Sequence, residues 1–346
     1  KGAVSGELTY RPPVTGTLAV DLLPVPQTGD AAPAVKLVVH NNSPLPQQLT
    51  WEVTLKGEQS LKEGKFLEVA STPAFFAEAA SGSLELRGGE SKEISLTLSG
   101  TDLYKVYRLR SVVRDASGRA VTLERPVSAF YGVPKLKVPL AEGAFPSAAD
   151  WERAPVRKLD NIDQFYAFVQ KEKPVQDWKG ADDLSAEISY LWDEGHLFVR
   201  VKVTDDIAGK IVSADGGLWQ LDGLQFLVDP MRTSERKVGK YEYSVGEGTK
   251  GPQTWCTLSA DGAAPAGDVP EVKLSLKRGK AGDIVYEIAF PWSRLAPFKP
   301  APGANLGLTL IVNEDDGNGR DAFMTWFGNA HSKDIDTVGD LILLEN

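Results

Sequence analysis

Two pairs of adjacent aspartates are the residues of this chain whose chemistry is easiest to name. Asp205-Asp206 follows the strand-like run VKVT, and Asp315-Asp316 follows the run LIVNE. Calcium takes about six to eight oxygen ligands in flexible geometry, and carboxylates at loop bends supply them. Acid-glycine turns are also ordinary turn chemistry. The second run lacks the alternating acids and the closing glutamate of an EF-hand loop, so we expect a structural calcium site of another kind at these four aspartates.

The 8 tryptophans are the second group of interest. An exposed indole is a flat apolar platform for the C–H face of a sugar ring, while nearby amides and acids bond its hydroxyl groups. Trp219 lies in the loop DGGLWQLDG and Trp326 in the turn-rich run MTWFGNAHS, so both are candidate platforms. Trp178 and Trp255 fit either role. The tryptophans on alternating strands or beside prolines are expected in the core: Trp51, Trp151, Trp192 and Trp292.

Residues for nucleophilic catalysis are sparse. The 3 histidines are His40 at a strand end, His196 in a predicted turn and His331 in a loop. A nucleophilic triad needs a histidine held by partners on both sides. We interpret the single cysteine, Cys256, as a small buried apolar residue. The sequence also contains no phosphate loop, dinucleotide fingerprint or HExxH motif.

A glycosidase pair of carboxylates is harder to exclude, because strand sequences do not show which acids meet in space. Glu242 and Glu287 are the candidates. Glu287 alternates with Tyr286 and Ile288, which is typical of a solvent-facing position on a strand. The sequence therefore favours a non-catalytic chain.

Period-two alternation predicts the elements that position these residues. In residues 35–40, Val35, Leu37 and Val39 share one face, and similar short strands recur through the first 130 residues. Residues 186–203 predict a hairpin that turns at the tetrad DEGH. We expect an all-β chain of two antiparallel β-sandwich domains.

A proline-rich stretch without periodicity, from Tyr131 to Trp151, predicts the boundary between these domains. The expected organisation is an immunoglobulin-like sandwich over residues 1–133, a linker over 134–150 and a larger sandwich over 151–346.

Charge and composition exclude several classes of function. Residues 1–135 carry 15 Lys+Arg and 14 Asp+Glu, whereas residues 136–346 carry 23 and 33, a net charge of −10. Nucleic-acid binding needs a basic surface, so the second part is not expected to bind nucleic acid. No stretch approaches the ~18 uninterrupted apolar residues of a membrane span. The first residue is Lys rather than Met, so we expect a processed or trimmed chain, and removal of a signal peptide is one way to produce it.

Five segments in residues 140–346 together resemble the family 9 carbohydrate-binding modules. In order, these are LSAEISYLWDEGHLFVRVKVTDD, GLWQLDGLQFLVDP, IVYEIAFPWSRL, LGLTLIVNEDDG and VGDLILL. The family's usual opening is reduced here to Asp150-Trp151. The first domain is similar, through generic strand patterning, to the immunoglobulin-like or fibronectin-like spacer domains of carbohydrate-active enzymes.

The resemblance implies a calcium-binding β-sandwich that grips the end of a sugar chain between two tryptophans. It implies that Trp219 is the first of these, that Gln225 stands where the family has an acid, and that Glu242 lies near a polar sugar contact. Asn329 matches the amide before the second tryptophan. The position of that second tryptophan falls at about Ser332, so Trp326 or His331 would have to replace it, or the site has one platform only.

We therefore expect non-catalytic carbohydrate binding, of a polysaccharide or oligosaccharide, in the accessory region of a larger secreted or periplasmic protein. A catalytic domain is expected in the same full-length chain. One alternative is a structural or interaction domain whose sugar site has decayed. Another is a haem-binding domain of the DOMON type, whose available ligands would be Met231, Met324, His196 and His331.

Overall fold

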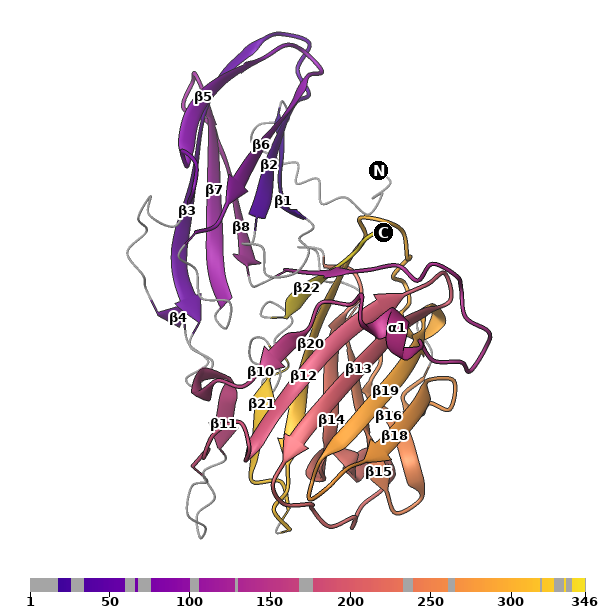
Figure 1. The fold of residues 1–346 in the computed structure, drawn as a ribbon. Helices are drawn as coiled ribbons and strands as arrows, with labels where there is room; N and C mark the ends of the chain where they lie inside the picture. Colours follow the sequence, from indigo (N-terminus) through magenta and orange to yellow (C-terminus); the bar gives the residue numbers. More distant parts are fainter. Residues whose placement is uncertain are drawn as a thin grey trace. The chain divides into compact units, whose positions relative to one another are not determined.

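The chain forms two compact units, which meet in sequence between Phe130 and Tyr131. This computed structural model describes residues 18–25, 34–59, 66–67, 76–99, 106–127, 130–167, 177–232, 239–260, 265–317, 319–326, 333 and 338–345. Within them the chain is nearly all β, as expected, with antiparallel sheets in both units (Figure 1).

Unit 1 contains two antiparallel sheets. One has the order β1 (Leu18–Val25), β2 (Ala34–Asn41) and β6 (Ser91–Thr97). The other has the order β4 (Phe66–Leu67), β3 (Gln47–Gln59), β7 (Val106–Asp115) and β8 (Ala120–Val127), with β5 (Ser81–Leu86) also on β3.

The predicted alternation of β2 is confirmed, because Val35, Leu37 and Val39 are completely buried while Lys36 and His40 are partly exposed. Alternating apolar residues bury one face of each sheet and leave the other face polar. The immunoglobulin-like classification of this unit stays a prediction.

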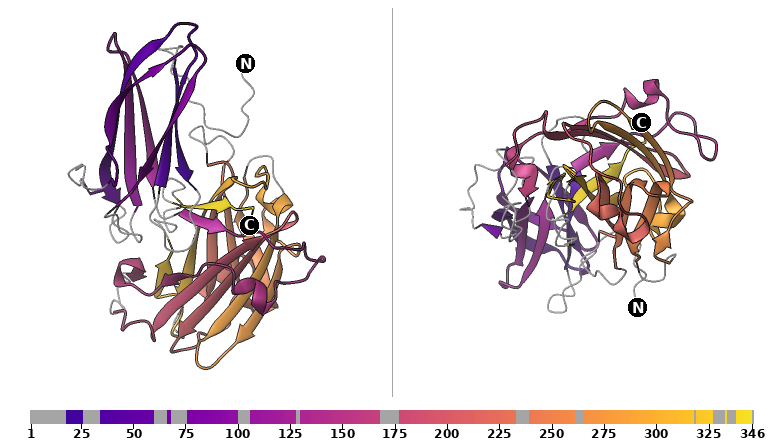
Figure 2. Two further views of the ribbon diagram at one scale, coloured as in Figure 1. Left: turned by 45° about the horizontal axis from the view of Figure 1, so that its top comes forward. Right: turned by 90° about the horizontal axis from the view of Figure 1, so that it is seen from below.

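Unit 2 is built from a five-stranded and a nine-stranded antiparallel sheet (Figure 2). The five-stranded sheet has the order β10 (Arg157–Leu159), β12 (Leu184–Trp192), β13 (His196–Asp205), β19 (Ile284–Pro291) and β18 (Lys273–Arg278). The main path of the nine-stranded sheet is β11 (Phe165–Ala167), β21 (Ala322–Thr325), β20 (Asn305–Glu314), β14 (Gly223–Asp229), β15 (Tyr241–Gly248), β16 (Gly251–Leu258) and β17 (Gly267–Asp268). Strand β22 (Gly339–Leu343) pairs with β20 and with β9 (Phe130–Val133).

The predicted hairpin is confirmed as β12 and β13. Leu184 pairs with Asp205 at its open end, and Trp192 pairs with Leu197 next to the turn. Its turn is held by Asp193, whose Oδ1 accepts the backbone N–H groups of Gly195 and His196 at 2.8 Å. Short polar side chains that bond their own backbone favour such turns.

The expected linker at 134–150 is wrong, because this stretch is part of unit 2. Leu136 donates its backbone N–H to the carbonyl of Trp192 at 2.8 Å, and Leu140 donates to Asp193 Oδ2 at 3.1 Å. Helix α1 (Ala148–Trp151) begins with a capping box between Ser147 and Asp150. The stretch lacks alternation because most of it lies outside the strands.

Several tryptophans lie in the core of unit 2. Trp151, Trp192 and Trp292 are at most 6% exposed, as expected from their strand and turn positions. Trp151 packs in one cluster with Leu136, Leu191, Phe198 and Ala289. Trp51 of unit 1, also expected in a core, is only half-buried.

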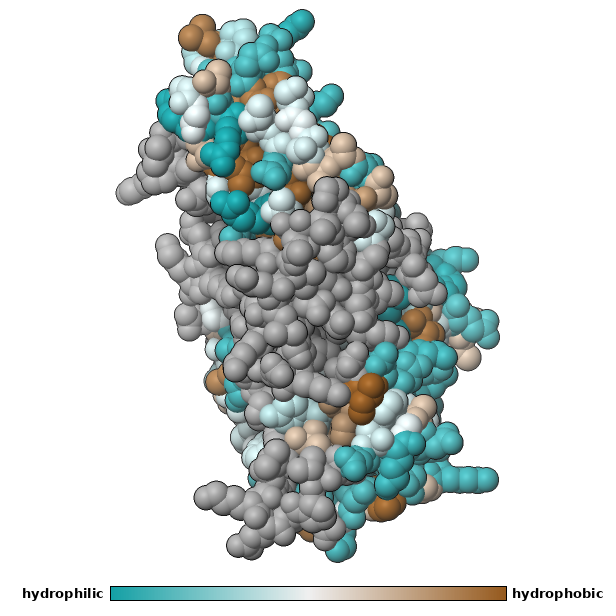
Figure 3. Space-filling model, turned by 90° about the vertical axis from the view of Figure 1, so that its left-hand side faces the viewer, coloured by the Kyte–Doolittle hydropathy of each residue, from teal (hydrophilic) through white to brown (hydrophobic). Residues whose placement is uncertain are grey.

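Large apolar side chains at the surface are scattered. On the face shown in Figure 3, hydrophobic residues of the described part appear as separate spots among hydrophilic ones. Scattered surface apolar residues are normal. Trp219 is the one tryptophan among the large hydrophobic residues that are exposed in the described part of the chain.

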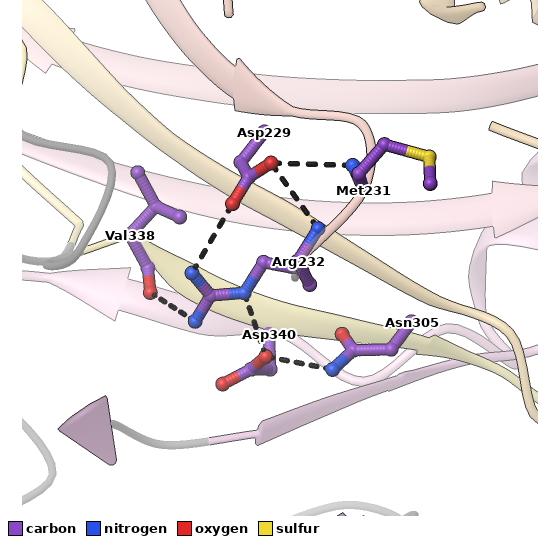
Figure 4. Close-up of polar contacts among 6 residues, drawn as sticks. All are labelled: Asp229, Met231, Arg232, Asn305, Val338 and Asp340. Carbon is purple, nitrogen blue, oxygen red and sulfur yellow. Dashed lines mark hydrogen bonds and ion pairs between the residues drawn. The ribbon is translucent and has the colours of Figure 1, made fainter. Parts of the chain in front are cut away.

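A buried ionic network joins β14, β20 and β22 (Figure 4). Arg232 follows β14, and its side chain is 8% exposed. Its Nε donates to Asp340 Oδ1 at 3.0 Å, its Nη1 lies 3.7 Å from Asp229 Oδ2, and its Nη2 donates to the Val338 carbonyl. Asn305 donates to the same Asp340 oxygen at 2.8 Å.

Gly307 is needed beneath this network, since a Cβ there would lie 2.3 Å from Arg232 Cδ. The arginine thus passes directly over the backbone of β20. It fixes the C-terminal strand β22 by charge as well as by strand pairing.

We expect Arg232→Ala to lower the free energy of unfolding of unit 2 by roughly 3–5 kcal/mol, because it leaves two buried carboxylates uncompensated. Lys202→Ala, which removes an exposed ion pair to Glu187, should cost at most about 1 kcal/mol. Urea unfolding followed by tryptophan fluorescence measures this, because every tryptophan except Trp51 lies in unit 2. Equal effects of the two variants would show that the buried network contributes little.

Candidate functional site

The two faces of the nine-stranded sheet have different chemistry. On one face, Phe226 and Tyr243 lie side by side and both contact Phe290 of β19. The ring centroid of Phe290 lies 5.4 Å from that of Phe226 and 5.3 Å from that of Tyr243. This face therefore packs against the five-stranded sheet. Because side chains alternate along a strand, their sequence neighbours point to the opposite face.

We call this opposite face the site face and define it by Gln225, Glu242, Ser244, Ile311 and Asn313. The strand register places Gln225 between Ser244 and Ile311, and pairs Leu227 with Glu242. Asn313 is paired with Gly223 on one side and Phe323 on the other. The sheet thus brings together polar groups from β14, β15 and β20.

Glu242 is the one acid among the residues that define the site face. It is 6% exposed, and its Oε1 accepts a hydrogen bond from Gln225 Nε2 at 3.2 Å. Lys333 Nζ lies 2.7 Å from Glu242 Oε2. Two of the residues named from the sequence, Gln225 and Glu242, are therefore in direct contact.

Trp219 lies in the short helix η3 (Asp215–Gln220) and is 41% exposed. The helix is held to the edge of the sheet by Asp215, which contacts Lys250 Nζ at 2.5 Å and Gln253 Nε2 at 3.1 Å. Gly216 lies close to the half-buried Trp255, since a Cβ on it would be 3.4 Å from Trp255 Nε1. Trp255 pairs with Ser244, so η3 is fixed beside the site face.

Arg320 connects Trp219 to the site face, and the sequence analysis did not identify it. Its guanidinium carbon lies 5.8 Å from the ring centroid of Trp219 and 4.9 Å from that of Phe323. Burial lowers the pKa of Arg320 to about 10, while the negative charge of Glu242 acts in the opposite direction. The available sequence signal was an isolated arginine in the run DDGNGRD.

The expectation for Trp326 is wrong, because this residue belongs to the core. It is 2% exposed, and its ring lies 5.5 Å from Tyr190 and 6.2 Å from Tyr131, measured between centroids. A stacking platform needs an exposed ring face, which Trp326 does not offer. Asn329 and His331 lie outside the described residues.

Three of the four aspartates named as metal ligands come together. Asp205, Asp206 and Asp316 place one carboxylate oxygen each within 4.8 Å of one another. Burial raises the pKa of Asp205 to about 7, with further contributions from the charges of Asp222, Asp316 and Asp206. Burial and the charge of Asp206 also raise the pKa of Asp316. This cluster has the oxygen donors and the negative charge that suit a hard cation.

Asp315 has a different role from the one expected. Its Oδ1 accepts the backbone N–H groups of Gly317 and Gly319, both at 2.8 Å, and so shapes its own loop. Asp222, which sequence reasoning did not select, ties two loops together by accepting the N–H of Gly209 at 2.7 Å and that of Asp315 at 2.8 Å. These bonds bring the loops of Asp205-Asp206 and Asp315-Asp316 together.

The remaining candidates are spread over both sheets. Glu287 is on β19 and forms an ion pair with Lys277 at 3.4 Å, whereas Glu242 is on β15 of the other sheet. Met324 is fully buried in β21, and Met231 follows β14. His196 begins β13, and its Nδ1 lies 3.6 Å from Asp193 Oδ1.

Within the described ranges, no helix has the length and apolar character to cross a membrane.

Comparison with known proteins gives a family match. The model of the family described as "Carbohydrate family 9 binding domain-like" matches residues 160–346, which is more than half of the chain. Endo-1,4-beta-xylanase A of Thermotoga maritima is 26% identical over 167 residues, covering 46% of this chain and 14% of that xylanase. The chain therefore matches only a small part of this relative.

Two solved structures are also similar. A family 9 carbohydrate-binding module from Caldicellulosiruptor kristjanssonii, in complex with cellotriose, shares 19% identity over 63% of this chain and 95% of that chain, with a TM-score of 0.44. A putative carbohydrate-binding protein from Bacteroides uniformis shares 13% identity over 62% and 98% of the respective chains, with a TM-score of 0.43.

The different burial of the two candidate tryptophans makes a testable contrast. Trp326→Ala should lower the free energy of unfolding by about 3–5 kcal/mol, because it empties a packed aromatic cluster. Trp219→Ala should cost less than about 1 kcal/mol, since the ring is well exposed. Urea unfolding of the two variants beside the wild type gives both values, and a larger loss for Trp219→Ala would contradict this assignment.

Proposed function

The chain belongs to the carbohydrate family 9 binding domain-like family, whose members are non-catalytic carbohydrate-binding modules, and we propose from this premise that a sugar stacks on Trp219. The observation that carries the proposal is one exposed tryptophan fixed beside a sheet face with polar side chains. Sugar C–H groups would contact the indole, and Gln225 and Glu242 would bond hydroxyl groups.

The proposed wider role is that of an accessory region. The curated relative is a xylanase, and the match spans 14% of it. We propose by analogy that a catalytic domain is present in the same full-length chain and that the protein acts on polysaccharide outside the cytoplasm.

A structural role is the second candidate, and the burial of Trp326 favours it. With Trp326 in the core, Trp219 is the one exposed tryptophan of the described residues, so stacking would come from a single platform. In this case unit 2 would mediate contacts within a larger chain and bind no sugar.

Trp219→Ala decides between the two candidates. If the sugar stacks on this ring, its loss should weaken polysaccharide binding by roughly 5- to 150-fold, equivalent to about 1–3 kcal/mol by analogy with base stacking. Affinity electrophoresis and isothermal titration over a panel of polysaccharides measure the change. Trp51→Phe in unit 1 is the matched control and should bind like the wild type. A folded wild-type protein that binds no member of a broad panel would favour the structural role.

We further propose that calcium binds at Asp205, Asp206 and Asp316. The donor set fits, because hard carboxylate oxygens lie close together and their mutual repulsion opposes ionisation. A bound divalent cation would neutralise this repulsion and hold the two aspartate loops together. Its proposed effect is structural, since it would stabilise the loops that join β13 to η3 and β20 to β21.

Calcium should therefore stabilise unit 2. At a free concentration about 100-fold above the dissociation constant, binding contributes about 2.7 kcal/mol, or roughly 5–10 °C in Tm. Differential scanning calorimetry with calcium and with chelator measures the shift. Asp206→Asn should remove most of it, whereas Asp268→Asn, an exposed acid on β17, should leave it intact. Equal Tm values with calcium and chelator would exclude a structural calcium here.

A further inference from the structure

Cationic side chains lie at the site face although the surrounding sequence is acidic. Residues 136–346 carry a net charge of −10. Two cationic side chains, Lys333 and Arg320, nevertheless lie near Glu242, and a third, Lys240, contacts the Lys333 backbone. Lys333 contacts the Glu242 carboxylate at 2.7 Å, Lys240 donates to the Lys333 carbonyl, and Arg320 is close enough for the charge of Glu242 to affect its pKa. Two cations, Lys333 and Arg320, therefore lie close to this one carboxylate.

Three described acids on neighbouring elements pair with other cations. Asp229 and Asp340 interact with Arg232 in the buried network of Figure 4. Asp215 pairs with Lys250 at the edge of the sheet. These three carboxylates are therefore paired with cations other than Lys333 and Arg320.

Asn313 is an independent observation that points to a ligand. Its side chain is 1% exposed, and neither atom of its amide has a hydrogen-bond partner within the described structure. A buried amide without partners costs free energy unless another molecule satisfies it. Gln225 Oε1, on the same face, is also buried without a partner.

The strand register places Asn313 next to Arg320. Asn313 pairs with Phe323, and the Arg320 guanidinium lies over the Phe323 ring at 4.9 Å. The other neighbour of Asn313 is Gly223, which has no side chain. An amide donor, a guanidinium and the exposed Trp219 ring thus occupy adjacent positions.

We propose that the sugar bound at Trp219 carries a carboxylate, so that the ligand class is a polysaccharide containing uronic acid residues. This inference rests on the proposed function of the same face. The planar guanidinium of Arg320 matches a carboxylate in geometry and charge, and charge-assisted bonds of this kind are stronger than neutral ones. Lys333 supplies a second positive charge, and Asn313 supplies amide donors.

The test compares polygalacturonate with its carboxyl-reduced form, which keeps the same linkages but loses the charge. The intact chain should bind the acidic polymer at least roughly 10-fold more tightly, since a hydrogen bond to a charged group is worth about 1.5–3 kcal/mol. Raising the ionic strength from about 0.01 M to about 1 M should weaken this binding, because the Debye length falls from about 30 to about 3 Å.

Variants assign the preference to this face. Arg320→Gln and Lys333→Gln should each reduce the preference for the acidic polymer, and Lys333→Gln provides a half-exposed position in case Arg320→Gln fails to fold. Lys202→Gln changes the net charge equally but lies on β13 of the other sheet, so it should leave the preference unchanged.

The outcomes separate this inference from the proposed function. Equal binding of polygalacturonate and its carboxyl-reduced form would overturn the inference and leave sugar binding intact. Binding of neutral xylan or cello-oligosaccharides without any binding of polygalacturonate would do the same. A preference for polygalacturonate that Lys202→Gln reduces as much as Lys333→Gln would also overturn it, because the attraction would then be non-specific. Loss of all binding, acidic and neutral, would contradict both.

Discussion

The aromatic contact between the two sheets of unit 2 determines which way the polar side chains of β14 and β15 point. Phe226 and Tyr243 pack on Phe290, so the even-numbered side chain of β14 and the odd-numbered one of β15 face the core. Strand geometry then sends Gln225 and Glu242 to the opposite face. A shift of one residue in register would bury the polar set and expose the aromatic one. The apolar core thus fixes the polar face indirectly.

Buried charge is handled differently in three parts of the same unit. Arg232 pairs with two aspartates and so secures β22. Asp222 accepts backbone N–H groups from two loops, and such charge-assisted bonds stabilise a buried carboxylate. The cluster of Asp205, Asp206 and Asp316 has three like charges in close proximity. The compensated carboxylates, at Arg232 and at Asp222, help to specify the structure. The close like charges of the aspartate cluster instead favour binding of a cation.

The proposed sugar site and the aspartate cluster share one chain segment. Residues 206–222 run from the cluster through η3, which carries Trp219, to Asp222 at the start of β14. Asp222 is bonded to the loops on both sides of the cluster. Ordering of the aspartate loops would therefore also restrict the position of Trp219. The proposed calcium ion would thereby have a physical route to influence sugar affinity without contacting the sugar.

Alternation and turn chemistry are local properties, so the sequence by itself determined the all-β class, the buried set of β2, the hairpin of β12 and β13, and the family resemblance. Burial and cross-strand contact are not local, because they depend on which strands become neighbours. Only the tertiary structure could therefore decide that Trp326 is in the core, that residues 134–150 belong to unit 2, and that Asp315 shapes its own loop while its neighbour Asp316 joins Asp205. For the same reason the sequence analysis did not select Arg320 or Asn313, because their environment is created by β14, β20, β21 and η3 only when these elements have assembled.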